Sequence, residues 1–139
     1  MRLVLDTNTV ISGLLWHGTP GKLIDAARAG TISLFTSAPW LAELRGVLSR
    51  RKFAGQLETR ALQAAGIFEG YAALAAIVAP AIIAPAVAQD PTDDADLACA
   101  LAAQADPIVS GDPHLLNLKS YQGIPIVGTA EALGRIARR

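Results

Sequence analysis

The chain has 139 residues, of which 52% are hydrophobic and 5% aromatic. This length predicts a single domain over residues 1–139, and the apolar content supports a core and excludes a disordered chain. The twelve basic and twelve acidic residues balance, and the single cysteine, Cys99, excludes both a disulfide scaffold and a cysteine-based zinc site.

The first half of the chain alternates short apolar runs, typical of strands, with helical patterns. Pro20 suits the first turn of a helix, and Gly30 suits the position just after its end. Ser37 is a favourable cap for a later helix. The predicted elements are strands over Arg2–Leu5 and Thr31–Thr36, and helices over Thr7–Leu15, over Pro20–Ala29 and from Ser37 onward.

The second half continues this alternation, with a proline-punctuated extended element in its middle. The predicted elements are a helix over about Gln56–Val78, an extended element over Ala79–Ala88, a helix over Asp93–Ala105, strands at Ile108–Ser110 and Ile124–Val127, and a helix from Thr129. Strands that alternate with helices indicate an α/β fold with a largely parallel sheet.

Targeting and membrane signals are weak. The apolar start is interrupted by Arg2 and stopped by Asp6, which is too short for a secretory signal, so we expect a cytoplasmic protein. Tyr71–Ala88 carries no charge over eighteen residues, but it is dominated by alanine and interrupted by Pro80 and Pro85. A helix end followed by buried extended chain explains this stretch better than a membrane span.

Two acidic residues follow predicted strands. Asp6 comes directly after the first strand, and Asp112 follows the strand at Ile108–Ser110. Ligands of open parallel sheets bind beyond the carboxyl ends of the strands, so both side chains are expected at one site. Each could also be a turn residue or a helix cap.

Two further acids lie on apolar helix faces. Glu43 is three residues after Trp40, and Asp94 is three residues before Leu97, which places each carboxylate on a buried stripe. An unpaired buried carboxylate costs several kcal/mol, and pairing the charge or binding a metal ion avoids that cost. Converging carboxylates of this kind suit Mg²⁺ or Mn²⁺.

Simpler interpretations cover the other polar residues. Asp90 and Asp93 are explained by the positive end of the following helix, which favours negative charge. Cys99 is expected in the core. His17 and His114 are expected on the surface or in loops, since two histidines this far apart in the sequence form no metal pattern.

Four segments together resemble those of the PIN-domain family. They are LVLDTNTVIS at residues 3–12, SAPWLAELRGVL at residues 37–48, DPTDDADLACA at residues 90–100 and IVSGD at residues 108–112. The resemblance is to the VapC-like branch, the toxins of toxin–antitoxin pairs, and covers almost the whole chain in the right order. It implies a three-layer α/β/α sandwich, dependence on Mg²⁺ or Mn²⁺, frequent homodimers and cleavage of RNA.

The family's acidic positions carry over one at a time. They fall on Asp6, Glu43, Asp94 and Asp112, which the resemblance implies as catalytic residues and metal ligands. Asp93 and Asp96 compete for the third position, and Asp96 stands where this branch commonly has an apolar residue. Asn8 and Ser110 match positions that hydrogen-bond the acids. Together with Asp96, they are expected to lie around the metal ligands and to orient them.

The partners follow from the same resemblance. RNA is the expected substrate, and an acidic pocket needs positive charge nearby to hold its phosphates. The candidates are Arg45, Arg50, Arg51 and Lys52, which could equally be a solvated helix end. A small antitoxin protein and a second copy of the chain are the expected protein partners, and no membrane is expected.

Other classes explain the acids less well. A phosphatase of the haloacid-dehalogenase type needs an aspartate two residues after the first, where this chain has Asn8. A phosphate-accepting receiver domain needs a strand-end lysine, and Lys119 is poorly placed for that role. A PIN-like scaffold without activity and an RNA-processing nuclease without an antitoxin remain alternatives.

Overall fold

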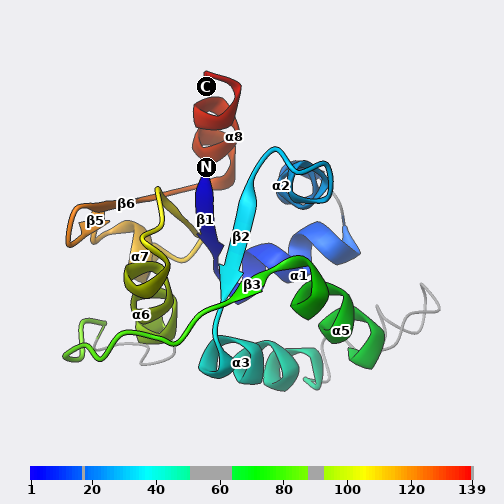
Figure 1. Cartoon of the computed structure of the whole chain (residues 1–139), viewed down its shortest axis with the longest axis horizontal. Coiled ribbons are helices and arrows are strands. Elements are labelled where there is room, and N and C mark those ends of the chain that lie inside the picture. Colours follow the sequence, from blue (N-terminus) through cyan, green and yellow to red (C-terminus); the bar gives the residue numbers. More distant parts are fainter. Residues whose placement is uncertain (17, 51–63, 88–92, 139) are drawn as a thin grey trace.

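A six-stranded sheet forms the centre of the chain in a computed structural model that describes residues 1–16, 18–50, 64–87 and 93–138 (Figure 1). The strand order is β3-β2-β1-β4-β6-β5, and all neighbours pair in parallel except β5, which is antiparallel to β6. The strands are β1 (Arg2–Leu5), β2 (Ser33–Thr36), β3 (Ala76–Ile77), β4 (Ile108–Val109), β5 (Ser120–Tyr121) and β6 (Ile124–Val127).

Helices cover both faces of this sheet. They are α1 (Thr7–Leu15), α2 (Gly18–Arg28), α3 (Ala38–Leu48), α5 (Ala64–Leu74), α6 (Asp93–Ala103), α7 (Pro113–Leu116) and α8 (Thr129–Ala137). Because strand side chains alternate, Leu3 and Leu5 of β1 pack into one core with α1, α2, α3, α5 and α8, while Val4 packs into the other core with α6 and α7. The predicted three-layer α/β/α sandwich with a mostly parallel sheet is therefore confirmed.

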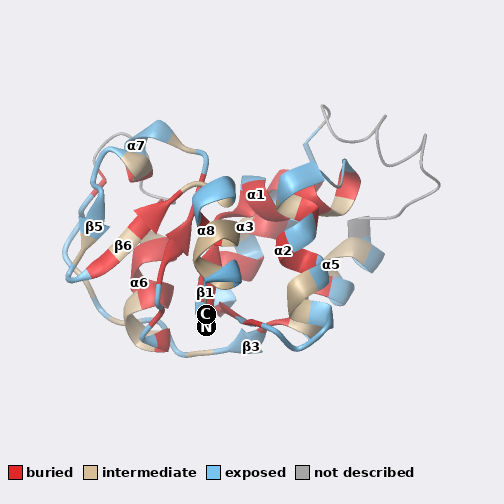
Figure 2. Cartoon of the chain, turned by 90° about the horizontal axis from the view of Figure 1, so that it is seen from above, coloured by how far each residue is buried: buried red, intermediate tan, exposed pale blue. Residues whose placement is uncertain are grey.

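The central strands are buried, whereas the sheet edges are exposed (Figure 2). A parallel strand covered on both faces is apolar along its whole length, which explains the uninterrupted Leu3–Leu5 run of β1. At one edge, Ile77 of β3 is 63% exposed. Among the described residues, no helix is long and apolar enough to cross a membrane.

Several predicted elements are confirmed. Strand β1, helix α1 and strand β6 have the expected bounds, and α6 and α8 begin at the expected residues. Ser37 caps α3 as predicted, since its Oγ accepts a hydrogen bond from the backbone N–H of Trp40. Gly30 follows α2 with φ +80°, the left-handed conformation that favours glycine.

The region after α3 differs from the prediction. The first part of the expected helix from Gln56 lies outside the described residues, and α5 ends at Leu74 instead of continuing to Val78. The strand is β3, not the proline-rich stretch after it, because Ala76 and Ile77 pair with the free edge of β2. The described residues 79–87 form no regular element. Helix α7 and strand β5 were not predicted.

Candidate metal centre

The first acid, Asp6, lies where β1 ends and α1 begins. Its backbone N–H donates to the Val109 carbonyl over 2.9 Å, which joins the ends of β1 and β4. The side chain is almost fully buried, with 4% exposure. Its Oδ1 accepts the N–H of Thr9 at 2.8 Å and its Oδ2 accepts the Ser110 hydroxyl at 2.5 Å. Asp6 is therefore both a helix cap and a fixed, buried carboxylate.

Ser110 connects Asp6 to the second strand-end acid, Asp112. The buried Ser110 Oγ donates to Asp6 and accepts the backbone N–H of Asp112 at 2.9 Å. Asp112 in turn caps α7, because its Oδ1 accepts the backbone N–H of His114 at 2.9 Å. The Ser110 hydroxyl thus bonds both to the Asp6 carboxylate and to the backbone of Asp112, the two acids that follow β1 and β4.

Glu43 comes to the same edge of the sheet on α3. This helix starts directly after β2, and the indole N–H of Trp40 donates to the Leu5 carbonyl at 2.9 Å, which fixes α3 to the end of β1. One turn further on, the partly buried Glu43 faces Thr7, whose hydroxyl donates to Oε1 at 3.4 Å. The sequence interpretation had not identified Thr7 as a partner of this acid.

Helix α6 brings Asp93 and Asp96, rather than Asp94, to this group. Asp93 and Asp96 are 6% and 2% exposed, and a spacing of three residues places them on one face of the helix. Asp94 is directed elsewhere: its Oδ1 accepts the backbone N–H groups of Ala86 and Val87 at 3.1 and 3.0 Å. The structure thus places Asp93 and Asp96, the two competitors for the third position, beside the other acids, whereas one oxygen of Asp94 binds the backbone of residues 86 and 87.

The reason for this difference lies in the burial of α6. The expectation for Asp94 rested on an apolar stripe that begins at Leu97, but Leu97, Ala98, Cys99 and Ala100 are all buried. A helix that is apolar on every side has no stripe that identifies the face of one acid. The expectation that Asp93 is explained by the helix end alone is incomplete for the same reason, whereas the buried position expected for Cys99 is confirmed.

The charges of these acids act most strongly on Asp96. Burial raises the pKa of Asp96 well above its usual value, and the charges of Asp6, Glu43 and Asp93 raise it further, against a smaller opposing contribution from Trp40. The charges of three acids, Asp6 after β1, Glu43 on α3 and Asp93 on α6, thus act on a fourth acid that is buried. Such mutual repulsion is typical of functional sites and of metal centres without their ion.

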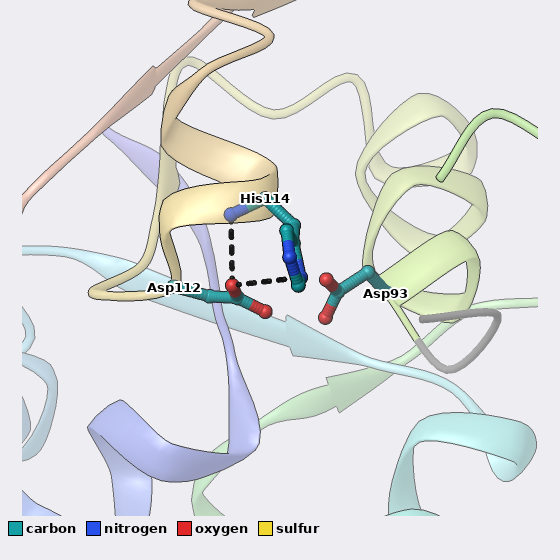
Figure 3. A group of neighbouring side chains, drawn as sticks. All are labelled: Asp93, Asp112 and His114. Atoms are coloured by element: carbon teal, nitrogen blue, oxygen red, sulfur yellow. Dashed lines mark hydrogen bonds and ion pairs between the residues drawn. The ribbon is translucent and has the colours of Figure 1, made fainter. Parts of the chain in front are cut away.

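His114 joins the group on the side of α7. One ligand atom each from Asp93, Asp112 and His114 lies within 4.8 Å of the others, and Figure 3 shows the imidazole between the two carboxylates. His114 is exposed, as expected, although it lies in α7 and not in a loop, and its ring lies beside Asp112 and Asp93. The sequence signal was its position two residues after a strand-end acid.

A cavity of about 690 Å³ opens beside Asp112 and His114. Its lining also includes Asn8, Ser110 and Thr129. Asn8 is exposed, and within the part of the chain that the structure describes its side chain makes no hydrogen bond to an acid. Of the two residues expected to hydrogen-bond the acids, the structure places only Ser110 in that contact.

The basic residues predicted to hold RNA are described only in part. Arg45 and Arg50 are exposed, whereas Arg51 and Lys52 lie outside the described residues. The Arg45 guanidinium lies over the Phe68 ring, 4.3 Å from its centroid. Arg45 also lines a smaller cavity of about 280 Å³ between α3 and α5, whose lining includes Glu69 but none of the acids of the candidate metal centre.

The donor set fits a divalent cation. Asp96 Oδ1 is buried and has no hydrogen-bond partner among the described residues, and such an atom is costly unless a cation or proton compensates it. Several carboxylates surround it, and carboxylate oxygens are the ligands that Mg²⁺ and Mn²⁺ prefer. A divalent ion in this group would offset both the repulsion and the unsatisfied oxygen.

The fold and this group of acids define an α/β domain with a candidate metal centre at the carboxyl ends of its strands. The sequence profile of the PIN domain matches residues 2–114, so the chain belongs to the PIN-domain family. PIN domains are generally metal-dependent nucleases and typically bind divalent metals. No curated protein matches the chain.

Proposed function

We propose that this PIN domain is a divalent-metal-dependent endoribonuclease that hydrolyses phosphodiester bonds of RNA. The single observation that carries the proposal is the convergence of Asp6, Glu43 and Asp93 on the buried Asp96. A protein avoids gathering so many acids around a buried one unless a cation occupies the space between them.

The proposed ion is Mg²⁺ or Mn²⁺, held by carboxylates from three separate parts of the chain. The ligands would be Asp6, Asp93 and Asp112, with Glu43 and Asp96 as further ligands directly or through water. Such an ion, when bound, acts as a Lewis acid on the scissile phosphate and stabilises the oxygen that leaves.

The surrounding residues keep these carboxylates in place. Ser110 and the Thr9 N–H hold both oxygens of Asp6, so its carboxylate plane is fixed before any ion binds. Such partners of metal ligands orient them and tune their basicity. No residue of the chain needs to act as a covalent nucleophile in this mechanism.

The cavity beside Asp112 is the proposed position of the RNA strand. Its lining includes Asn8, Ser12 and Thr129, whose neutral polar side chains are able to hydrogen-bond sugar or phosphate oxygens without adding negative charge. Arg45, Arg50, Arg51 and Lys52 are the proposed contacts for phosphates further along the strand, because an acidic site must obtain its affinity for a polyanion elsewhere.

Within the family, we propose the VapC-like role, in which the enzyme is the toxin of a toxin–antitoxin pair. Its partners would be a small antitoxin protein and a second copy of the chain, and its location the cytoplasm. A PIN-like scaffold without activity and a processing nuclease without an antitoxin are the alternatives. RNA cleavage would exclude the first, and a gene for a small antitoxin next to this one would argue against the second.

Asp6→Asn tests the activity most directly. Asparagine caps helices about as well as aspartate, so the variant keeps the cap of α1 while losing the charge. We expect the wild-type chain to cleave an RNA panel with Mg²⁺ or Mn²⁺ but not with a chelator, and Asp6→Asn to be inactive although folded.

Asp25→Asn is the matched control, because Asp25 lies on α2 with an exposed side chain beside Arg28. It should cleave RNA at the wild-type rate. An Asp6→Asn variant that still cleaves RNA, or a wild-type chain equally active with a chelator, would refute the proposal.

A further inference from the structure

We propose that His114 supplies a nitrogen ligand to the metal centre, beside Asp93 and Asp112, and that the site therefore selects a divalent first-row transition-metal ion, such as Mn²⁺, over Mg²⁺. This inference rests on the proposed function, because it specifies the ion of the same centre. It differs from an all-carboxylate centre in having one nitrogen ligand, and that ligand can be detected without measuring RNA cleavage.

The geometry of the three side chains supports shared coordination. The ligand atoms of Asp93, Asp112 and His114 lie within 4.8 Å of one another, and Nδ1 of His114 is 3.6 Å from Oδ1 of Asp112. Two ligands on opposite sides of an ion at bond lengths of roughly 2.1 Å are about 4.2 Å apart. A small movement of the side chains is enough to place an ion between them.

The position of His114 permits that movement. The Asp112 carboxylate holds the backbone N–H of His114 at 2.9 Å, so the start of α7 is fixed relative to the site. The imidazole itself is 47% exposed and borders the cavity of about 690 Å³. The ring is therefore able to rotate toward an ion while its backbone stays in place (Figure 3).

A second observation, independent of this trio, indicates that a cation belongs here. Asp96 Oδ1 is buried without a hydrogen-bond partner among the described residues. Asp93, three residues earlier on the same face of α6, is one of the acids whose charge acts on Asp96. Asp93 therefore belongs to the trio and also interacts with Asp96, the residue whose buried oxygen lacks a hydrogen-bond partner among the described residues.

The chemistry of the imidazole determines which ion is favoured. Mg²⁺ prefers oxygen ligands in a near-ideal octahedron, whereas imidazole nitrogen suits transition metals. Affinities of a given site rise from Mn²⁺ through Fe²⁺ and Co²⁺ to Ni²⁺. Replacing one oxygen ligand by a nitrogen should therefore lower the affinity for Mg²⁺ relative to all of these ions.

Electron paramagnetic resonance of bound Mn²⁺ tests this assignment without relying on activity. Electron spin-echo modulation detects the ¹⁴N nucleus of a directly bound imidazole. We expect ¹⁴N modulation in the wild-type chain with Mn²⁺ alone, and its loss in His114→Ala. The same variant should bind Mn²⁺ at least about tenfold more weakly by calorimetry, because removing even a hydrogen-bond partner of a metal ligand costs about that much.

Two further variants control the result. His17→Ala removes the only other histidine of the sequence and should keep the ¹⁴N signal. His114→Asp restores an oxygen ligand, so it should bind Mg²⁺ and Mn²⁺ with more similar affinities than the wild-type chain and show no ¹⁴N modulation.

The outcomes separate this inference from the proposed function. If wild-type chain binds Mn²⁺ without ¹⁴N modulation, or if the modulation persists in His114→Ala, His114 is not a ligand, although the carboxylate centre stands. If neither Mn²⁺ nor Mg²⁺ binds, both the centre and this inference are refuted.

Discussion

Asp96→Asn removes the carboxyl group whose ionisation is most unfavourable in the metal-free protein. Asp96 is 2% exposed, and both its burial and the neighbouring acids raise its pKa well above the usual 3.8. In the folded chain this carboxyl keeps its proton over a pH range in which the unfolded chain has already lost it. The folded state therefore binds more protons than the unfolded state, and its stability falls as pH rises through that range.

The proton that Asp96 retains sets the size of this pH dependence. Each pH unit between the unfolded and the folded pKa of Asp96 removes about 1.4 kcal/mol from the free energy of unfolding. Asparagine does not titrate, so the variant escapes this loss, although its buried amide carries a cost that does not change with pH.

Urea unfolding from pH 4.5 to 7.5 in the presence of a chelator measures the effect. The difference in stability between Asp96→Asn and wild-type should grow with pH at up to about 1.4 kcal/mol per unit, and then become constant. Glu69→Gln, which changes an exposed carboxylate of α5, is the control and should leave the wild-type slope unchanged. A difference that does not change with pH would refute the reasoning.

Adding Mn²⁺ should stabilise the wild-type chain more than the variant. A cation favours the ionised carboxylate, so at a hundredfold excess over its Kd the ion should stabilise the wild-type chain by ~2.7 kcal/mol. The variant lacks one carboxylate of the centre and should gain less. A larger stabilisation of Asp96→Asn than of wild-type by Mn²⁺ would place Asp96 outside the metal centre.

One labelling experiment and two substitutions test the packing around the sheet. Burial raises the pKa of the Cys99 thiol to about 12, so a thiol reagent at pH 8 should not label the native chain but should label it fully in urea; rapid native labelling would contradict the buried position. A Cβ at residue 13 would lie 3.0 Å from the Pro20 carbonyl oxygen, so Gly13→Ala should lower stability by ~1–3 kcal/mol in urea unfolding, whereas the open Gly66 is the control. The buried Tyr71 hydroxyl has no hydrogen-bond partner among the described residues, so Tyr71→Phe should raise stability by ~1 kcal/mol, and a loss would reveal a partner.

The two strand-end acids show how a structural and a chemical role combine in one side chain. Asp6 and Asp112 each cap a helix through one oxygen, Oδ1. In Asp112, Oδ2 takes no part in the cap and is available to a ligand, whereas in Asp6 Oδ2 accepts the Ser110 hydroxyl. The cap and the metal centre are therefore compatible uses of the same carboxylate, and mutations that preserve the cap are the informative ones.

The sequence by itself determined the layers and most of the elements. Strand β1 and helix α1 follow from local patterns, namely an apolar run that ends at a carboxylate and a helix that this carboxylate caps. The same local logic placed Asp6 and Asp112 at strand ends, because parallel strands present their carboxyl ends at one edge. Such features depend on residues near one another in the chain, so the sequence suffices to predict them.

Tertiary packing decided which acids of α6 face the site and where the edge strand lies. Asp93, Asp94 and Asp96 share one turn of α6. Only the docking of this helix places Asp96 near Asp6 and Glu43, and Asp93 near Asp112, while Asp94 binds the backbone of residues 86 and 87. Strand β3 likewise exists because β2 has a free edge for it. The proximity of His114 to Asp93 likewise joins positions 21 residues apart. Contacts of this kind have no local signature, because their free energy comes from partners that only the folded chain brings together.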